Sequence, residues 1–262
     1  NGMKYSDLPN KIRAGLDRRS ISSIVLLKES APNDEDAIFL RQLVFERLNT
    51  GGVKLERQEL RNSLGSGDFN NILFELARLN IFRNIWGLPH FTEEELENHK
   101  LPIYEIAFFK KMEDLEVVLR FFALRHMNNF KLGIQGFLDL FMIRSKNFSH
   151  QDCNFLKTLY TDTINTAYAI YDINVFKTHA DGQYSKSPMK GVYDGVMVGL
   201  SNHYGHYDLL IAHKSEIIEK TIQLFSEKGI SALTGRASTK EDLENRIQYF
   251  SNIFSEVIHQ YV

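Results

Sequence analysis

Two arginines and two adjacent glycines stand out in residues 45–62, which read FERLNTGGVKLERQELRN. Gly51 and Gly52 permit positive φ angles and leave their backbone N–H groups uncovered. Such N–H groups just before the N-terminus of a helix form an anion site that the helix dipole favours. Arg47 lies one turn before the glycines and Arg61 follows them, and arginine can grip a phosphate through two N–H groups at once. The pattern therefore predicts a phosphate-binding loop.

The same stretch also has a purely structural interpretation. Gly51 can end the preceding helix as a C-cap, while Asn49 and Thr50 satisfy loose backbone groups and the arginines stay in solvent. In either case the next helix is expected to begin near Lys54 or Leu55. Spacing alone leaves both interpretations open, because a pair of glycines is a weak motif.

The composition is that of an ordinary globular protein. The 262 residues suffice for one large domain or two small ones, and 43% of them are hydrophobic and 24% charged. The formal net charge of -2 gives no indication of nucleic acid or of an acidic membrane as a partner. No apolar run approaches the roughly 20 residues of a membrane span. A single cysteine, Cys153, excludes an internal disulfide and favours a cytoplasmic location.

Apolar spacing predicts a mainly α-helical chain. The segment ISSIVLL at residues 21–27 is the one convincing strand, so the short sheet is expected within the first 30 or so residues. Residues 87–103 are expected to be a loop, and residues 177–191 are rich in turns. The spacing predicts helices around residues 8–16, 37–48, 72–79, 115–122, 134–141, 156–171, 218–228 and 243–258.

A second candidate phosphate contact lies in TGRASTK at residues 234–240. Arg236 and Lys240 there stand beside a helix start, where Ser238 to Glu241 reads as a capping box. Capping alone also explains this segment. On the helix around residue 119, Glu116 and Arg120 are spaced as a surface ion pair.

Three further groups have a plainer interpretation beside the chemical one. His203 and His206, with Asp208 nearby, could bind a metal, although no second pair completes a site and an exposed aromatic loop explains them more simply. Cys153 beside His150 could be a reactive thiolate, or a lone buried cysteine in a helix. The segment ADGQYSK at residues 180–186 reads as an ordinary turn.

A resemblance adds weight to the phosphate hypothesis. The segment VFERLNTGGVKLERQELRNSL, preceded by YSDLP at residues 5–9, resembles the N-terminal domain family of GmrSD restriction endonucleases. The segments DLEVVLRFFAL (114–124), KGVYDGVMVGL (190–200) and LTGRASTKEDLENRI (233–247) are similar to later, looser parts of that family. The resemblance implies nucleotide or phosphate contacts at Arg47, Asn49, Thr50, Gly51 and Gly52, with a supporting role for Glu59 and Arg61. Gln58, which also matches the family pattern, is a further candidate for the nucleotide or phosphate site.

The family also implies a domain division. Residues 1–66 would be the C-terminal part of a ParB-like α/β domain, and residues 67–262 a helical domain. The cofactor expected of the complete protein is a nucleoside triphosphate with Mg²⁺, and the expected partners are DNA and an upstream segment or nuclease subunit. The family's hallmark Asp-Gly-Gln-Gln-Arg is not found in the sequence. The chain is therefore expected to hydrolyse little nucleotide by itself.

Two functions follow as expectations. The first is a part of a restriction or phage-defence endonuclease of the GmrSD type, which contributes a phosphate- or nucleotide-binding loop coupled to DNA cleavage or sensing. The second is a non-enzymatic helical scaffold that binds a protein partner or DNA, with the glycine pair as a plain cap.

Overall fold

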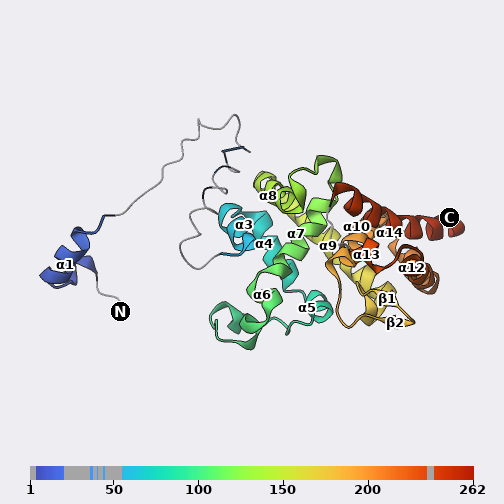
Figure 1. Ribbon diagram of the computed structural model, residues 1–262, viewed down its shortest axis with the longest axis horizontal. Coiled ribbons are helices and arrows are strands. Elements are labelled where there is room, and N and C mark those ends of the chain that lie inside the picture. Colours follow the sequence, from blue (N-terminus) through green and yellow to red (C-terminus); the bar gives the residue numbers. More distant parts are fainter. Residues whose placement is uncertain (1–3, 21–35, 38–39, 41–43, 45–54, 235–238) are drawn as a thin grey trace.

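The computed structural model describes residues 4–20, 36–37, 40, 44, 55–234 and 239–262. The chain is mainly α-helical, as predicted (Figure 1). The predicted strand at residues 21–27 and the glycine pair lie outside the described residues. Among those described, the helix termed α1 (Asn10–Asp17) begins directly after Pro9, in agreement with the short helix expected there.

Most of the described chain forms one helical body. Its first helices are α3 (Arg57–Leu64), α4 (Asp68–Ala77), α5 (Asn80–Trp86), α6 (Ala107–Lys110), α7 (Glu113–Leu124) and α8 (Gly133–Ser145). They are followed by α9 (His150–Tyr171), α10 (Lys190–Ser201), α11 (Tyr207–Ala212), α12 (Lys214–Lys228), α13 (Ile230–Thr234) and α14 (Lys240–Tyr261). The segment predicted as a loop, residues 87–103, also contains 3-10 turns at Glu93–Leu96 and from Pro102 to Glu105.

The core lies where α7, α9, α10 and α14 meet (Figure 1). Aromatic rings fill much of it: Phe121 and Phe122 on α7 pack edge-on against each other and contact Tyr160 on α9. All three side chains are almost fully buried. Edge-to-face ring pairs add to the free energy of plain apolar burial, so this layer fixes how α7 lies against α9.

Glycines set the close contact of α10 with α14. A Cβ atom on Gly195 would overlap the ring of Phe250, and one on Gly199 would lie 3.0 Å from the backbone nitrogen of Ser251. At the start of α10, a Cβ on Gly191 would lie 2.7 Å from the carbonyl oxygen of Leu233. These glycines are spaced four residues apart, on one face of the helix. They therefore let the backbones of α13 and α14 approach α10 directly.

Several helix ends follow the sequence signals, and one does not. Gly229 ends α12 with a φ of 76°, as a glycine stop should. The capping box of α14, however, lies one residue later than predicted: Thr239 accepts the backbone N–H of Asp242, and Asp242 accepts that of Thr239. Both registers match the capping-box pattern, so the sequence alone does not select between them.

The described sheet is not where the sequence predicted it. It is a two-stranded antiparallel hairpin of β1 (His179–Ala180) and β2 (Gln183–Tyr184), within the turn-rich segment. Asp181 and Gly182 join the strands with φ angles of 49° and 75°, which confirms the turn expected at this Asp-Gly pair. None of the described helices combines the length and apolar composition that crossing a membrane requires.

Candidate anion-binding site

The helix after the glycine pair begins two to three residues later than expected. Helix α3 starts at Arg57, and its N-terminus is closed by the chain itself. The carboxylate of Glu56 accepts the N–H of Glu59, and that of Glu59 accepts the N–H of Glu56 at 2.6 Å. Two carboxylates therefore occupy the positive end of α3. A phosphate near the glycine pair would be bound before this helix rather than at its first turn.

Arg61 anchors α3 to the helical body. Its guanidinium is fully buried and has five N–H donors. Nε donates to Asp139 on α8 at 2.6 Å, and Nη1 donates to Gln58 and to Glu116 on α7, both at 3.0 Å. Nη2 donates to the backbone and side-chain oxygens of Gln135. All five donors have acceptors within the protein, so the geometry favours the supporting role for Arg61 over a direct phosphate contact.

Neighbouring residues extend this network. Arg57 also pairs with Asp139, through two N–H groups. Gln58 is buried, and its amide donates to Asn62 one turn further along α3. Of the three predicted site residues on α3, Gln58 and Arg61 thus lie in one cluster, whereas Glu59 caps the helix.

A second buried cluster joins the three later segments of the family resemblance. Arg120 on α7 forms a two-bond ion pair with Asp194 on α10, and Nη1 of Arg246 on α14 lies 3.8 Å from the same carboxylate. The prediction that Glu116 and Arg120 form an ion pair on the surface is therefore wrong. Arg120 is only 7% exposed and pairs with Asp194, because its side of α7 faces α10 rather than solvent.

Lys190, the first residue of α10, connects α10 to α7. Its Nζ lies 2.8 Å from Glu113 and 4.0 Å from Glu116. Burial alone would raise the pKa of Glu116, but the charges of Arg61 and Lys190 outweigh it and hold that pKa below its ordinary value. Glu116 is therefore a fixed negative charge between the anchor of α3 and the start of α10.

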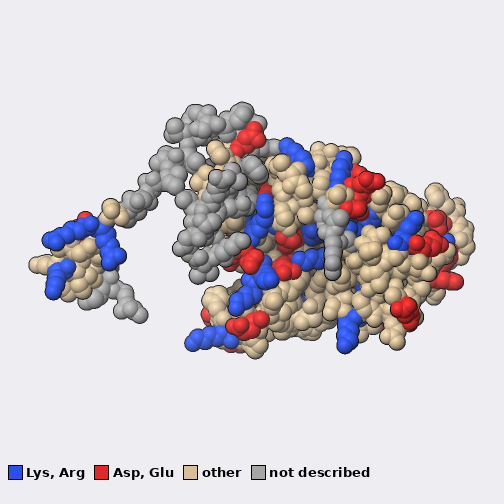
Figure 2. Space-filling view, viewed as in Figure 1, with Lys and Arg blue, Asp and Glu red and all other residues tan. Residues whose placement is uncertain are grey.

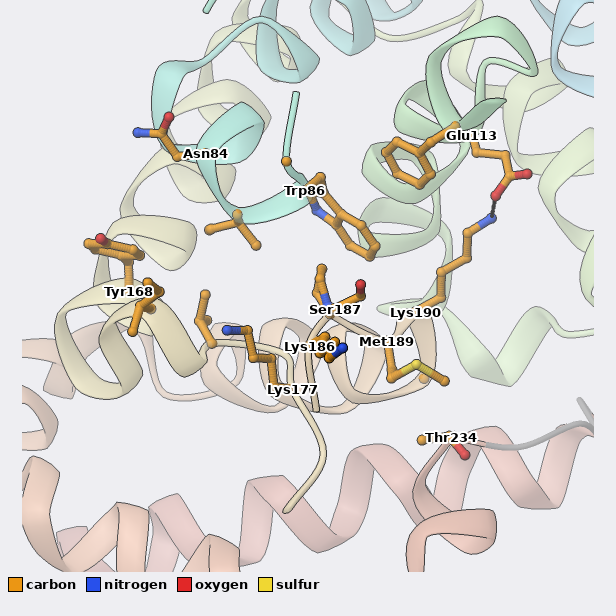
Figure 3. Close-up of a pocket in the computed structure, with 17 residues that line it drawn as sticks. Asn84, Trp86, Glu113, Tyr168, Lys177, Lys186, Ser187, Met189, Lys190 and Thr234 are labelled. Atoms are coloured by element: carbon orange, nitrogen blue, oxygen red, sulfur yellow. Dashed lines mark ion pairs between the residues drawn. The ribbon is translucent and has the colours of Figure 1, made fainter. Parts of the chain in front are cut away.

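Lys190 also lies in the wall of a large hollow, here named the lysine pocket (Figure 3). Its volume is about 820 Å³. Figure 3 shows the side chain of Lys190 extending toward Glu113 along one wall, and the ring of Trp86 turned into the hollow. The residues that line the pocket and bear on the argument are Trp86, Phe108, Tyr168, Lys177, Lys186 and Lys190.

The lysine pocket combines free cations with an aromatic wall. Among the described residues, neither Lys177 nor Lys186 has an ion pair, whereas Lys190 is paired. The rings of Trp86 and Phe108 stack with centroids 4.9 Å apart. The buried indole N–H of Trp86 has no hydrogen-bond acceptor in the described part of the chain. Such a wall suits an anion that carries a flat or apolar part.

A smaller hollow of about 290 Å³, here named the α3 hollow, adjoins the lysine pocket, because Glu113 and Lys190 line both. Arg57, Lys111 and Gln135 complete much of its wall. Basic and acidic side chains lie side by side over the face shown in Figure 2. Glu113 lines both hollows beside Lys190, so neither wall is uniformly basic.

The remaining predicted site residues divide into two groups. Arg47, Asn49, Thr50, Gly51 and Gly52 lie outside the described residues, as does Arg236. Lys240 is described: it is exposed and lies 3.5 Å from Glu244 on its own helix.

Described residues next to the two predicted phosphate segments border neighbouring hollows. Thr234, two residues before Arg236, lines the lysine pocket, and α3, which comes after the glycine pair, lines the α3 hollow. Lys190 is common to both hollows. Sequence reasoning missed Lys177, Lys186 and Lys190. The signal that could have found two of them is KSPMKG, in which Lys186 and Lys190 flank Ser-Pro-Met at the start of α10.

His203 and Cys153, the other candidates for chemistry, are held in contacts that stabilise the fold. His203 contacts the carbonyl and hydroxyl oxygens of Ser251, each at 3.2 Å. Cys153 is buried in α9, as the plainer interpretation predicted. Within the described part of the chain, no group of three or more histidine, cysteine or acidic side chains could hold a metal ion.

Comparison of the sequence with known protein families, with curated proteins and with solved structures found no match in any of the three.

Proposed function

We propose that this chain is the helical part of a GmrSD-type restriction or phage-defence protein, and that its lysine pocket and α3 hollow receive the phosphates of a nucleotide or of DNA. The observation that carries the proposal is the position of Lys190. Lys190 lines the α3 hollow, which is bordered by the helix that comes after the glycine pair, and also the lysine pocket, which is bordered by Thr234 at the start of the second phosphate segment. Two segments distant in sequence thus border one region in which lysine and arginine side chains outnumber acidic ones.

The buried clusters support the family assignment. Arg120, Asp194 and Arg246 come from the three separate segments that resemble the family, and they meet in one ion-pair cluster. In this proposal a shared architecture brings the three segments together, and the charges that they bury there require partners.

The chemistry of the lysine pocket supports a phosphate ligand. Lys177 and Lys186 bring two cations that lack ion-pair partners among the described residues. The stacked rings of Trp86 and Phe108 can hold a base or a sugar edge while the lysines contact phosphate. In this scheme the predicted loop from Arg47 to Gly52 adds backbone N–H groups.

Calorimetry of the chain with nucleoside triphosphates and with short duplex DNA tests the proposal. Lys177→Ala with Lys186→Ala should weaken binding of the preferred ligand by at least about tenfold, and binding should weaken as salt is added. Lys157→Ala is the matched control, because Lys157 is an exposed lysine on α9 that pairs with Glu75 away from both hollows. Equal affinity of the double variant and the control would refute the phosphate site.

The predicted loop has its own variants. Arg47→Ala should remove a charge-assisted contact of about 1.5–3 kcal/mol, and Gly52→Val should weaken binding if positive φ is required there. Unchanged affinity in both, with the fold preserved by circular dichroism, would leave the loop as a cap.

A scaffold role has one observation in its favour. Ile173 is 70% exposed, and Tyr168 and Met189 beside it in the wall of the lysine pocket are 37% and 38% exposed. These apolar side chains suit a protein partner. If the lysine variants bind nucleotide and DNA normally while Ile173→Ser prevents assembly with a nuclease subunit, the scaffold is the function.

A further inference from the structure

A third hollow has Glu59 of α3 in its wall and is not lined by Lys190. It has a volume of about 600 Å³ and is here named the Asp114 pocket. Asp114 belongs to the first turn of α7 and is only 4% exposed. Among the described residues, no side chain donates a hydrogen bond to its carboxyl group. Instead the carboxyl group accepts hydrogen bonds from backbone N–H groups at the start of α7.

Rings form much of the wall of the Asp114 pocket. Tyr104 contacts His99 and Phe109 edge-on, with centroids 5.1 Å and 5.3 Å apart. The guanidinium groups of Arg78 and Arg83 already lie over the rings of Phe74 and Phe109, each 5.9 Å from the ring centroid. The ring faces of this pocket thus already accept cations.

The charges around the pocket do not balance. The ionisable groups in its wall are Glu59 on α3, Arg78 after α4, Arg83 on α5, Glu95, His99 and Glu105 in the segment before α6, Lys110 on α6, and Asp114 on α7. Four are carboxyl groups and three are arginine or lysine. Arg83 and Glu95 form a buried two-bond ion pair, and Lys110 lies 3.7 Å from Glu105. Asp114 has no such partner among the residues that the structure describes.

We propose that the Asp114 pocket binds an organic amine, whose ammonium group pairs with Asp114 and whose apolar body packs against Phe74, Tyr104 and Phe109. The ligand would supply the missing positive charge. Without it, a proton takes that place: burial raises the pKa of Asp114 to about 7, although backbone N–H groups and Arg83 oppose the change. An amine that binds at lower pH must therefore displace this proton to solvent.

The test uses 2-phenylethylamine and tryptamine as probes, with 2-phenylethanol and tryptophol as neutral ligands of matched shape. Calorimetry of the chain near pH 6 should show binding of the amines, with the alcohols at least about tenfold weaker. Repeating the titration in buffers of different ionisation heat should show nearly one proton released per amine. Because Asp114 is ionised by about pH 8, amine affinity should rise about tenfold from pH 6 to pH 8 while proton release falls.

Asp114→Asn should remove both the preference for amines and the proton release. Asp208→Asn is the matched control, because Asp208 is an exposed aspartate in the first turn of α11 and does not line the pocket. Amines that bind no better than the alcohols, binding without proton release, or no binding at millimolar concentration would each overturn the proposal. These three results come from the wild-type chain, so they hold even if Asp114→Asn fails to fold. The phosphate site does not depend on any of them.

Discussion

Arg61 and Arg246 are equally buried, each 1% exposed, yet their surroundings differ. Every donor of Arg61 has an acceptor. Among the described residues, the ion pair of Arg246 is with Asp194, at 3.8 Å, and its Nε and Nη2 have no hydrogen-bond partner. Burial, together with the neighbouring Arg120, lowers the pKa of Arg246 although Asp194 opposes this. Arg61 therefore acts as a complete clamp, whereas the cluster around Arg246 keeps unused donors.

Three buried aspartates extend this comparison. Asp139 serves two arginines of α3, and Asp194 serves Arg120 and Arg246. Asp114 is buried to a similar degree without an arginine of its own in the described part of the chain. A buried carboxyl group is ionised at little cost only where a cation repays its lost hydration. The paired aspartates thus join helices, whereas the unpaired one is available to protons and ligands.

The largest effect should come from Asp194→Asn. The change leaves Arg120 and Arg246 buried together without their shared counterion, and breaking such a cluster costs about 3–5 kcal/mol. Asp139→Asn should cost less, because Arg61 keeps Glu116, Gln58 and Gln135 as acceptors. Urea unfolding of both variants measures the difference. A smaller loss for Asp194→Asn than for Asp139→Asn would reverse the ranking of the two clusters.

These clusters show where sequence reasoning succeeds. Helix positions follow from local spacing, and α7, α8, α9, α12 and α14 lie where the apolar periodicity predicted them. Partners do not follow from spacing. Glu116 is four residues from Arg120, but its ion pairs are with Arg61 and Lys190. Those residues are 55 and 74 positions away in sequence, and only the packing of α3 and α10 on α7 brings them together.

The candidate sites were harder to predict than the helices. A first-turn aspartate such as Asp114 usually stabilises a helix N-terminus in solvent, so nothing in the sequence marks it as buried. Lys190 was equally inconspicuous within a segment distinguished only by its family resemblance. By contrast, the glycine pair was conspicuous in sequence. The described residues begin again just after it with α3, a capped helix whose buried Arg61 already has an acceptor for every donor.

Asp114→Asn should separate the unpaired aspartate from the paired ones through pH. The pKa of Asp114 is about 7 in the folded chain against an ordinary value of 3.8. The folded state therefore holds the proton more tightly, and the contribution of Asp114 to wild-type stability falls as pH rises from about 4 to about 7. The variant lacks this loss, so its advantage should grow over that range and level off above it. At about 1.4 kcal/mol per pH unit, roughly three units set an upper limit of about 4 kcal/mol.

Thermal unfolding at a series of pH values measures that advantage, with Asp208→Asn as the control. Subtracting wild type removes the pH dependence of all other groups. Parallel curves for Asp114→Asn and wild type would mean that Asp114 is ionised and paired like the other two aspartates.

Gly195→Ala tests how strictly α10 and α14 fix the Asp194 cluster. The added methyl group would overlap the Phe250 ring, and overpacking of this kind costs about 1–3 kcal/mol. Gly15→Ala in α1 is the control, because no described atom lies within 4 Å of the Cβ position there. Chemical denaturation should show a loss for Gly195→Ala alone. Equal stability of the two variants would mean that α14 can shift and that its contact with Asp194 is loose.

The smallest effect is expected from Arg246→Met, and it bears most directly on the contrast between Arg61 and Arg246. Methionine fills a similar volume and removes two donors that lack acceptors, so the lost ion pair is offset by a removed desolvation cost. The change in unfolding free energy should stay within about 1 kcal/mol. Arg61→Met instead leaves the acceptors Asp139 and Glu116 short of a cation, and should cost about 3–5 kcal/mol. If urea denaturation gives both variants the same large loss, Arg246 has partners in solution beyond Asp194, and the two clusters are equivalent clamps.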